Sequence, residues 1–237
     1  MTLYSMVKMV MESNGWPSPV TEVSSSQDLN MKQALALAQK TLDQVSYSRQ
    51  WPILIEPATF DTVAGQAEYP LETDFHHIIS NAVFNSNQYW NMRGSLLPRD
   101  WIACQLGLAP VQSAYRMNPK GKTIRITPTP QAVESVTYEY VTLNLAYNAD
   151  GTPKRNFAMD SDYSRLDESI IELNFTWRWR QKKGLDYTAE LTEASAVTDQ
   201  RFAQMLALGE MPIGAGHAGP PLTSGYIGPN FNYPYGA

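Results

Sequence analysis

The hydrophobic pattern predicts its clearest helix over Ser164–Lys183, which reads SRLDESIIELNFTWRWRQKK. Acidic side chains fill the early turns and basic side chains the last ones, an order that complements the helix dipole. Ser164 and Asp167 have the spacing of a capping box, with Asp in place of the preferred Glu or Gln. Gly184 follows as the residue that ends many helices in a left-handed conformation. The sequence therefore predicts a capped helix that stops at Gly184.

The apolar positions of this helix predict which side of it is buried. Ile170, Leu173 and Trp177 form one stripe, with Ile171 and Phe175 beside it, so we expect a wide apolar face to pack against other segments. Trp179 lies two positions beyond Trp177 and projects to a different side. We therefore place Trp177 in the core and assign Trp179 to contact with a binding partner.

Three further stretches show the helical period of 3.6 residues. The first is Thr2–Asn14, closed by Gly15, and the second runs roughly over Leu29–Arg49. The third is Asp186–Leu208. The residues expected on their buried faces are Leu3, Met6, Val7 and Val10; Leu35, Ala38, Leu42 and Val45; and Leu191, Ala194, Phe202, Met205 and Leu206.

Between residues 53 and 145 the hydrophobic period changes from 3.6 towards 2, and Pro and Gly separate short runs. Residues 118–121 (NPKG) join two of these runs as a hairpin-like turn. In the last run Val136, Tyr138 and Tyr140 share one face. We expect strands over Ala58–Val63, His77–Asn85, Ser113–Met117, Thr123–Thr127 and Ser135–Leu143, and a brief helix over Arg99–Leu106.

Together these elements predict an α+β fold: a helical bundle of N- and C-terminal helices with an inserted small antiparallel β domain and an extended C-terminal tail. The bundle takes its helices from residues 1–52 and 148–208. The β-rich insertion covers residues 53–147.

The composition changes abruptly after Leu208. Residues 209–237 hold seven Gly, five Pro and a single charged residue, Glu210. Such a segment has too few apolar residues to form a core alone. It nevertheless carries aromatic side chains that can fill pockets on a partner. We assign partner binding to Tyr226, Phe231, Tyr233 and Tyr235.

Composition limits the function classes. Charged residues make up only 17% of the chain, which suits a protein that hides surface in an assembly; a neutral-surfaced monomer is the alternative. The net charge of −5, without a long basic run, argues against sequence-specific nucleic-acid binding. The single cysteine, Cys104, excludes an intramolecular disulfide and a CxxC zinc site. We expect a product made in the cytosol with no membrane contact, because the chain lacks a membrane-spanning stretch and a signal-peptide cleavage pattern.

Candidate chemical sites are few. No P-loop or nucleophile-elbow motif occurs. His76 and His77 are adjacent, so in a strand they point to opposite faces, and we expect them not to share a metal ion. The cluster between Trp177 and Lys183 is capable of stacking on nucleic acid, but packing and dipole roles explain it too. The sequence predicts no catalytic residue, no metal and no cofactor.

The order of these parts resembles the tail tubular protein A family, the head-to-tail adaptors of short-tailed bacteriophages. The resemblance spans about residues 3–208, and the first helix departs from it by using Met where the family often has Ala or Leu. It is carried by ESNG at 12–15 with Pro17–Val20, SRQWP at 48–52, GKTIRITPTP at 121–130 before the strand Val136–Val141, and Trp177 and Arg180 before GLDY at 184–187.

The resemblance implies a non-enzymatic structural connector of the virion. Its subunits would form a ring, a dodecamer, between the portal protein and the tail nozzle protein. The ring would extend the DNA channel, and genomic DNA would pass without specific binding. Helices would pack sideways into neighbouring subunits.

The alternative is a virion-associated enzyme that degrades surface polysaccharide with paired carboxylates. Glycoside hydrolysis needs two opposed acids, and this chain offers Asp160, Asp162, Asp167 and Glu168 close together in sequence. Loop solvation and helix capping account for the same positions.

Overall fold

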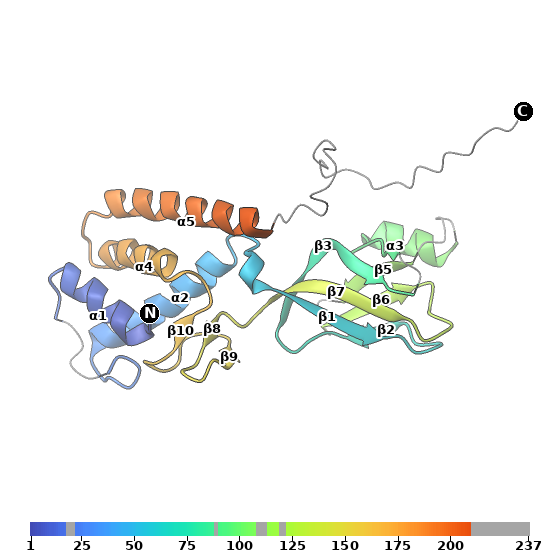
Figure 1. Ribbon diagram of the computed structural model, residues 1–237, viewed down its shortest axis with the longest axis horizontal. Helices are drawn as coiled ribbons and strands as arrows, with labels where there is room; N and C mark the ends of the chain where they lie inside the picture. The colour runs from blue at the N-terminus through green and yellow to red at the C-terminus, as the bar shows by residue number, and fades with distance from the viewer. Residues whose placement is uncertain (18–21, 88–89, 108–112, 119–121, 210–237) are drawn as a thin grey trace, which may run out of the picture.

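The fold mixes α-helices with small antiparallel sheets, which confirms the α+β class predicted from the sequence. Figure 1 shows an elongated molecule with most helices at one end and the two larger sheets at the other. The computed structural model describes residues 1–17, 22–87, 90–107, 113–118 and 122–209.

The helical part of the molecule consists of α1 (Leu3–Ser13), α2 (Leu29–Ser46), α4 (Glu168–Lys182) and α5 (Thr188–Gly209). Thr2, Asp28 and Asp167 cap the first three, each accepting a hydrogen bond from a backbone N–H of the first turn. α4 therefore begins after Asp167 and not at Ser164 as predicted. Gly184, with φ +72°, follows its end in the left-handed conformation that the sequence predicts.

α4 packs against α1, α2 and α5, so it is the helix that the others share. The predicted apolar face is right at Ile170, Ile171 and Phe175, which are buried. It is wrong at Leu173 and Trp177, which are both only half-buried. An apolar pattern marks no single face when a helix is covered on several sides. The residues that α4 buries are Ile170, Ile171, Asn174, Phe175 and Trp179.

α5 covers α4 with one side and leaves the other exposed (Figure 1). Asn174 of α4 donates to the hydroxyl of Thr198 at 3.2 Å, which gives this contact a polar centre. Ala194 is buried as predicted. Leu191 and Leu206 are instead 39% and 46% exposed, so the predicted stripe of this helix is wrong at both positions.

The β part contains two sheets and one short helix. The first sheet has the order β1-β7-β3-β4 and is formed by Ile55–Asp61, Ser135–Thr142, Phe75–Asn85 and Trp90–Asn91. The second sheet has the order β2-β6-β5 and is formed by Glu68–Pro70, Thr123–Thr127 and Ala114–Asn118. The short helix is α3 (Pro98–Gln105).

The remaining elements lie next to the helical part. A 3₁₀ turn, η1 (Pro52–Leu54), leads from the helices into β1. A small sheet with the order β10-β8-β9 is formed by Tyr163–Ser164, Ala146–Tyr147 and Pro153–Lys154. The stretch between β8 and β10 thus contains one short strand, β9.

The five strands predicted from the sequence are all present, with their ends moved by a few residues. β5 and β6 form the predicted hairpin, with Asn118 opposite Thr123. The turn residues 119–121 lie outside the described part of the chain. Among the described residues, none of the helices combines the length and apolar character needed to cross a bilayer.

β7 contributes to both hydrophobic cores. Val136, Tyr138 and Tyr140 point into the core of the β part, as the alternation predicts, whereas Val141 joins the core of the helical part. The exit of α2 is fixed by Trp51, which is fully buried and donates from Nε1 to the carbonyl of Val45 at 2.9 Å. The two parts are therefore joined by packing as well as by the chain.

The burial of the two tryptophans of α4 can be tested directly. We expect Trp179→Ala to lower the free energy of unfolding by about 3–5 kcal/mol, because it removes a large side chain that is 1% exposed. The matched variant Trp177→Ala should cost only about 1–2 kcal/mol, since its ring is half-buried. Urea unfolding of both variants measures the difference; equal losses would contradict this assignment of the buried face.

Candidate interaction surface

The residues predicted to bind a partner lie in two regions. Tyr226, Phe231, Tyr233 and Tyr235 are outside the described part of the chain. Trp179 is described and belongs to the core: it is 1% exposed, and its ring lies edge-on to that of another aromatic residue, Trp16. The centroids of the two rings are 6.3 Å apart. The assignment of Trp179 to a partner is therefore corrected, because almost none of its surface reaches solvent.

The basic end of α4 fastens the helical part together. The ammonium group of Lys183 lies 4.7 Å from the ring centroid of Trp16 and 4.5 Å from that of Trp179. It also donates to the side chains of Asn30 and Gln33 in α2, at 2.8 and 3.1 Å. This cation is held by aromatic faces and amide oxygens within the subunit.

Arg180 and Arg178 are similarly occupied. Arg180 forms an ion pair with Glu190 of α5 at 2.9 Å and donates to the side chain of Asn14 at 3.3 Å. Arg178 lies over the ring of Trp177, and burial lowers the pKa of its guanidinium to about 10. These contacts favour the packing role over the nucleic-acid role that the sequence left open.

The acids considered for hydrolysis also make contacts within the chain. Asp160 accepts hydrogen bonds from the backbone N–H groups of Val23 and Ser24, at 3.0 and 2.9 Å. Asp167 caps α4, and Glu168 pairs with the terminal amino group of Met1. Each carboxylate therefore has a structural role that accounts for its position.

Asp162 is the most buried of these acids. Its side chain is fully buried, pairs with Lys154 at 3.0 Å and accepts hydrogen bonds from the N–H groups of Ala158 and Met159, at 2.6 and 2.7 Å. Burial alone would raise the pKa of this carboxyl group. The donated hydrogen bonds and the lysine charge outweigh burial and hold the pKa below its ordinary value.

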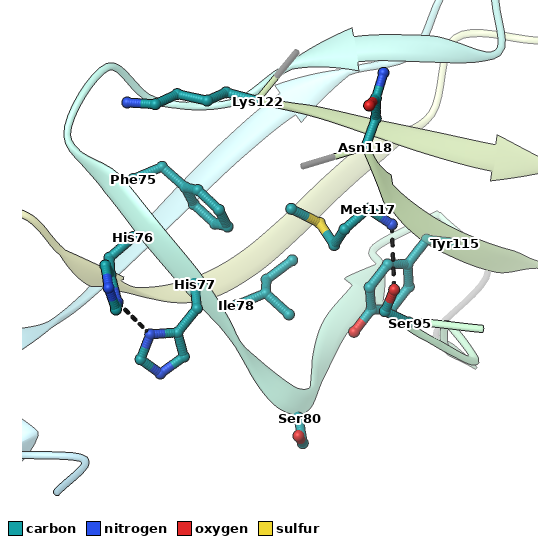
Figure 2. Close-up of a pocket in the computed structure, with 10 residues that line it drawn as sticks. All are labelled: Phe75, His76, His77, Ile78, Ser80, Ser95, Tyr115, Met117, Asn118 and Lys122. Carbon is teal, nitrogen blue, oxygen red and sulfur yellow. Dashed lines mark hydrogen bonds between the residues drawn. The ribbon is translucent and has the colours of Figure 1, made fainter. Parts of the chain in front are cut away.

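A hollow of about 410 Å³ lies between β3 and β5, and we call it the β3–β5 groove. In Figure 2 the side chains of Phe75, Ile78 and Met117 point into it, while polar side chains surround them. The residues that line it are Phe75, His76, His77, Ile78, Ser80, Ser95, Tyr115, Met117, Asn118 and Lys122.

The two histidines of the groove do not point apart as predicted. Their Nδ1 atoms are 2.6 Å apart and joined by a hydrogen bond (Figure 2). β3 changes register between Phe75 and His77, and this irregularity ends the strict alternation of side chains on which the prediction depended. Among the described residues, no group of three or more His, Cys, Asp or Glu side chains is arranged to hold a metal ion.

The same histidines connect the β part to the helical part. The ring of Tyr47, at the end of α2, stacks on His76 with centroids 4.1 Å apart. Burial lowers the pKa of His76, as do the charges of His77 and Arg155. Burial also lowers the pKa of His77. Both rings are therefore neutral near pH 7, so they can donate or accept a hydrogen bond.

A second hollow of about 360 Å³ lies between α2 and α4. Leu37, Lys40 and Lys182 are among the residues that line it. Sequence reasoning missed both hollows, because each joins residues far apart in the chain. Cys104 is half-buried beside the α3 cluster of Leu96, Trp101 and Ala114.

Comparison with known protein families identifies a match over most of the chain. The family described as SU10 adaptor protein matches residues 2–223. No curated protein matches the chain closely. The matched residues include every described helix and strand, and they agree with the adaptor resemblance predicted from the sequence.

The structural role of Asp162 makes a testable prediction. Asp162→Asn should lower the free energy of unfolding at pH 7 by about 2–4 kcal/mol, because Lys154 and two backbone N–H groups lose their anionic acceptor. Since the folded-state pKa is depressed, the wild-type advantage is complete above the ordinary Asp pKa of about 4 and disappears as the pH falls further. Chemical unfolding between pH 7 and 3 measures it.

Asp160→Asn is the matched control, because Asp160 is half-buried and accepts only two backbone hydrogen bonds. We expect it to cost about 1 kcal/mol. An Asp162→Asn protein as stable as the wild type would show that this carboxylate has no structural role and would reopen the catalytic alternative.

Proposed function

This chain belongs to the SU10 adaptor protein family, and on that premise we propose that it is a structural connector of a bacteriophage virion. It lies at the head-to-tail interface, between the portal protein and the tail nozzle protein, and it acts without catalysis. The observation that carries the proposal is the extent of the family match, residues 2–223.

In this proposal the subunits form a closed ring, a dodecamer, through one contact repeated by rotation. The exposed side of α5 supports such a contact. This helix is 22 residues long and packs on α4 with one side. Leu191 and Leu206 remain exposed and leave apolar surface for a neighbouring subunit. The helical bundle would then pack sideways, and the β part, at the other end of the molecule in Figure 1, would face further tail proteins.

The tail aromatics are proposed to bind the portal or a neighbouring subunit once the ring assembles. They are Tyr226, Phe231, Tyr233 and Tyr235, in a segment whose single charge is Glu210. Docking a segment with a single charged side chain removes water from few charged groups, so it costs little free energy of desolvation. Each contact is weak because the segment loses conformational freedom, and repetition around the ring strengthens the whole.

The ring is also proposed to extend the channel for the genome. Twelve copies at −5 each give 12 × −5 = −60, so the assembly is acidic. Arg180 and Lys183 are held in contacts within the subunit and are not available to phosphate. A channel with few free cations lets DNA move without tight binding, because few counterions are released.

Assembly is tested by measuring the native mass of the purified chain with and without a portal ring. We expect the portal to recruit a fixed number of 26.6 kDa subunits, twelve in this proposal. Leu191→Glu and Leu206→Glu should reduce recruitment at least tenfold by placing charge in the subunit contact. Leu97→Glu, at a more exposed leucine before α3 in the β part, is the control. Unchanged assembly by both α5 variants would contradict the proposed contact.

The channel proposal predicts weak DNA binding by the assembled ring. Electrophoretic mobility of duplex DNA at 50 and 200 mM salt should show little retention at either concentration. Binding that is tight at 50 mM and falls by three or more orders of magnitude at 200 mM would reveal several phosphate contacts and overturn the proposal.

A further inference from the structure

The β3–β5 groove lies along an open strand edge. Its lining includes Phe75, His76, His77 and Ile78, which are consecutive residues of β3. A hollow that touches consecutive residues of one strand runs beside that strand. Among the described strands, β7 pairs with one side of this stretch, while β4 pairs only with residues 84 and 85.

An open edge exposes backbone donors and acceptors that can pair with one more extended segment. The floor of the groove is apolar, since Phe75 and Tyr115 belong to the core of the β part and Ile78 and Met117 pack against it. The groove therefore offers backbone pairing and apolar contact in one place.

A buried hydroxyl group in the groove lacks a hydrogen-bond partner. Tyr115 is fully buried, and its OH has no partner among the described residues. Burial raises the pKa of this group, so it stays protonated and remains a donor at neutral pH. A buried donor without an acceptor costs free energy, which favours an occupant that brings a carbonyl or hydroxyl oxygen.

The C-terminal segment of the chain has the matching chemistry. Phe231, Tyr233 and Tyr235 alternate with Asn232 and Pro234, so in an extended strand the three rings share one face. The backbone groups of those three residues then point to one edge of the strand, and the nitrogen of Pro234 points to the other. The missing N–H of Pro234 would therefore face solvent, the arrangement in which edge strands tolerate proline.

The position of α5 brings this segment within reach. The ring of Phe202, near the end of α5, lies 5.3 Å from that of Trp51 and 5.2 Å from the guanidinium of Arg49. Tyr47, two residues before Arg49 in the chain, stacks on His76, which lines the groove. Residues 210–225 can span up to about 50 Å when extended, far more than this short path requires.

We propose that the segment FNYPY, residues 231–235, lies in the β3–β5 groove of its own chain before assembly. It pairs as an added strand with the edge of β3, and its alternate rings contact Phe75, Ile78 and Met117. Tyr115 donates to it, and the neutral imidazoles at the rim can accept from its tyrosines. The groove thus holds the aromatic segment away from other subunits until a partner competes for it. The role of the docked segment in assembly rests on the proposed function, whereas the docking itself does not depend on it.

Hydrogen exchange of the free full-length chain tests the docking. A tethered segment has an effective concentration on the order of 1 mM, so a separate affinity on the order of 0.1 mM keeps it docked about nine-tenths of the time. Replacing Phe231, Tyr233 and Tyr235 with Ser should therefore accelerate exchange in residues 75–80 about tenfold. Thermal melting verifies that the variant keeps its fold. Equal exchange rates in the two proteins would overturn the proposal.

A groove variant gives the reciprocal test. Met117→Glu places a charge in the groove at a half-buried position and should accelerate the same exchange, while Val133→Glu, at an exposed valine of the β part outside the groove, should not. Thermal melting verifies that both remain folded. Should Met117→Glu unfold, the tail variant decides the question alone.

Disulfide trapping distinguishes the source of the segment. In a Cys104→Ser background, Ser80→Cys and Tyr233→Cys should form a disulfide within one chain at low protein concentration, as seen by faster migration on a non-reducing gel. Cross-linked dimers without the internal disulfide would show that another copy supplies the segment and would contradict docking within the chain. Both measurements use the free chain, so a failure of ring assembly leaves their result unaffected.

Discussion

α4 must bury side chains against three other helices at once, and the helical part is arranged around this requirement. Its row of Phe175 and Trp179 lies in the core of the helical part, while Asn174 meets Thr198 of α5. The ammonium group of Lys183 lies over the rings of Trp16 and Trp179. The same side chains that complement the helix dipole therefore also connect the helices to one another.

The β part depends on the helical part through β7 and the end of α2. β7 sends alternate residues into one core and Val141 into the other, so neither core is independent of this strand. Asp74 accepts hydrogen bonds from Tyr140 and Thr142 where the strand leaves the sheet. Trp51 is buried on the other connection, which leads from α2 into β1. Both segments that connect the two parts are therefore held by packing or hydrogen bonds, which suits an adaptor with partners at both ends.

For an adaptor, the important feature is which groups remain available to partners. Arg178, Arg180 and Lys183 and the four acids considered for catalysis make contacts within the subunit, whereas two leucines of α5 and the β3–β5 groove are open surface. This distribution fits a protein whose specificity comes from shape and backbone pairing more than from charge. It is also consistent with the low charged fraction of the sequence.

Local signals in the sequence determined the elements of this protein. The left-handed Gly184 and the alternation of Val136, Tyr138 and Tyr140 act within a few residues, so they could be identified without a structure. The adaptor family was likewise evident from the order of motifs along the chain.

Only the tertiary structure decided which side of α4 is covered and how the start of β3 presents its side chains. Trp179 rather than Trp177 entered the core because three helices surround α4, and no periodicity within α4 specifies where its neighbours lie. His76 and His77 converge because pairing with β7 shifts register beside them, a property of two strands and not of one. The β3–β5 groove likewise depends on tertiary structure, because its lining residues come from two strands that only folding brings together.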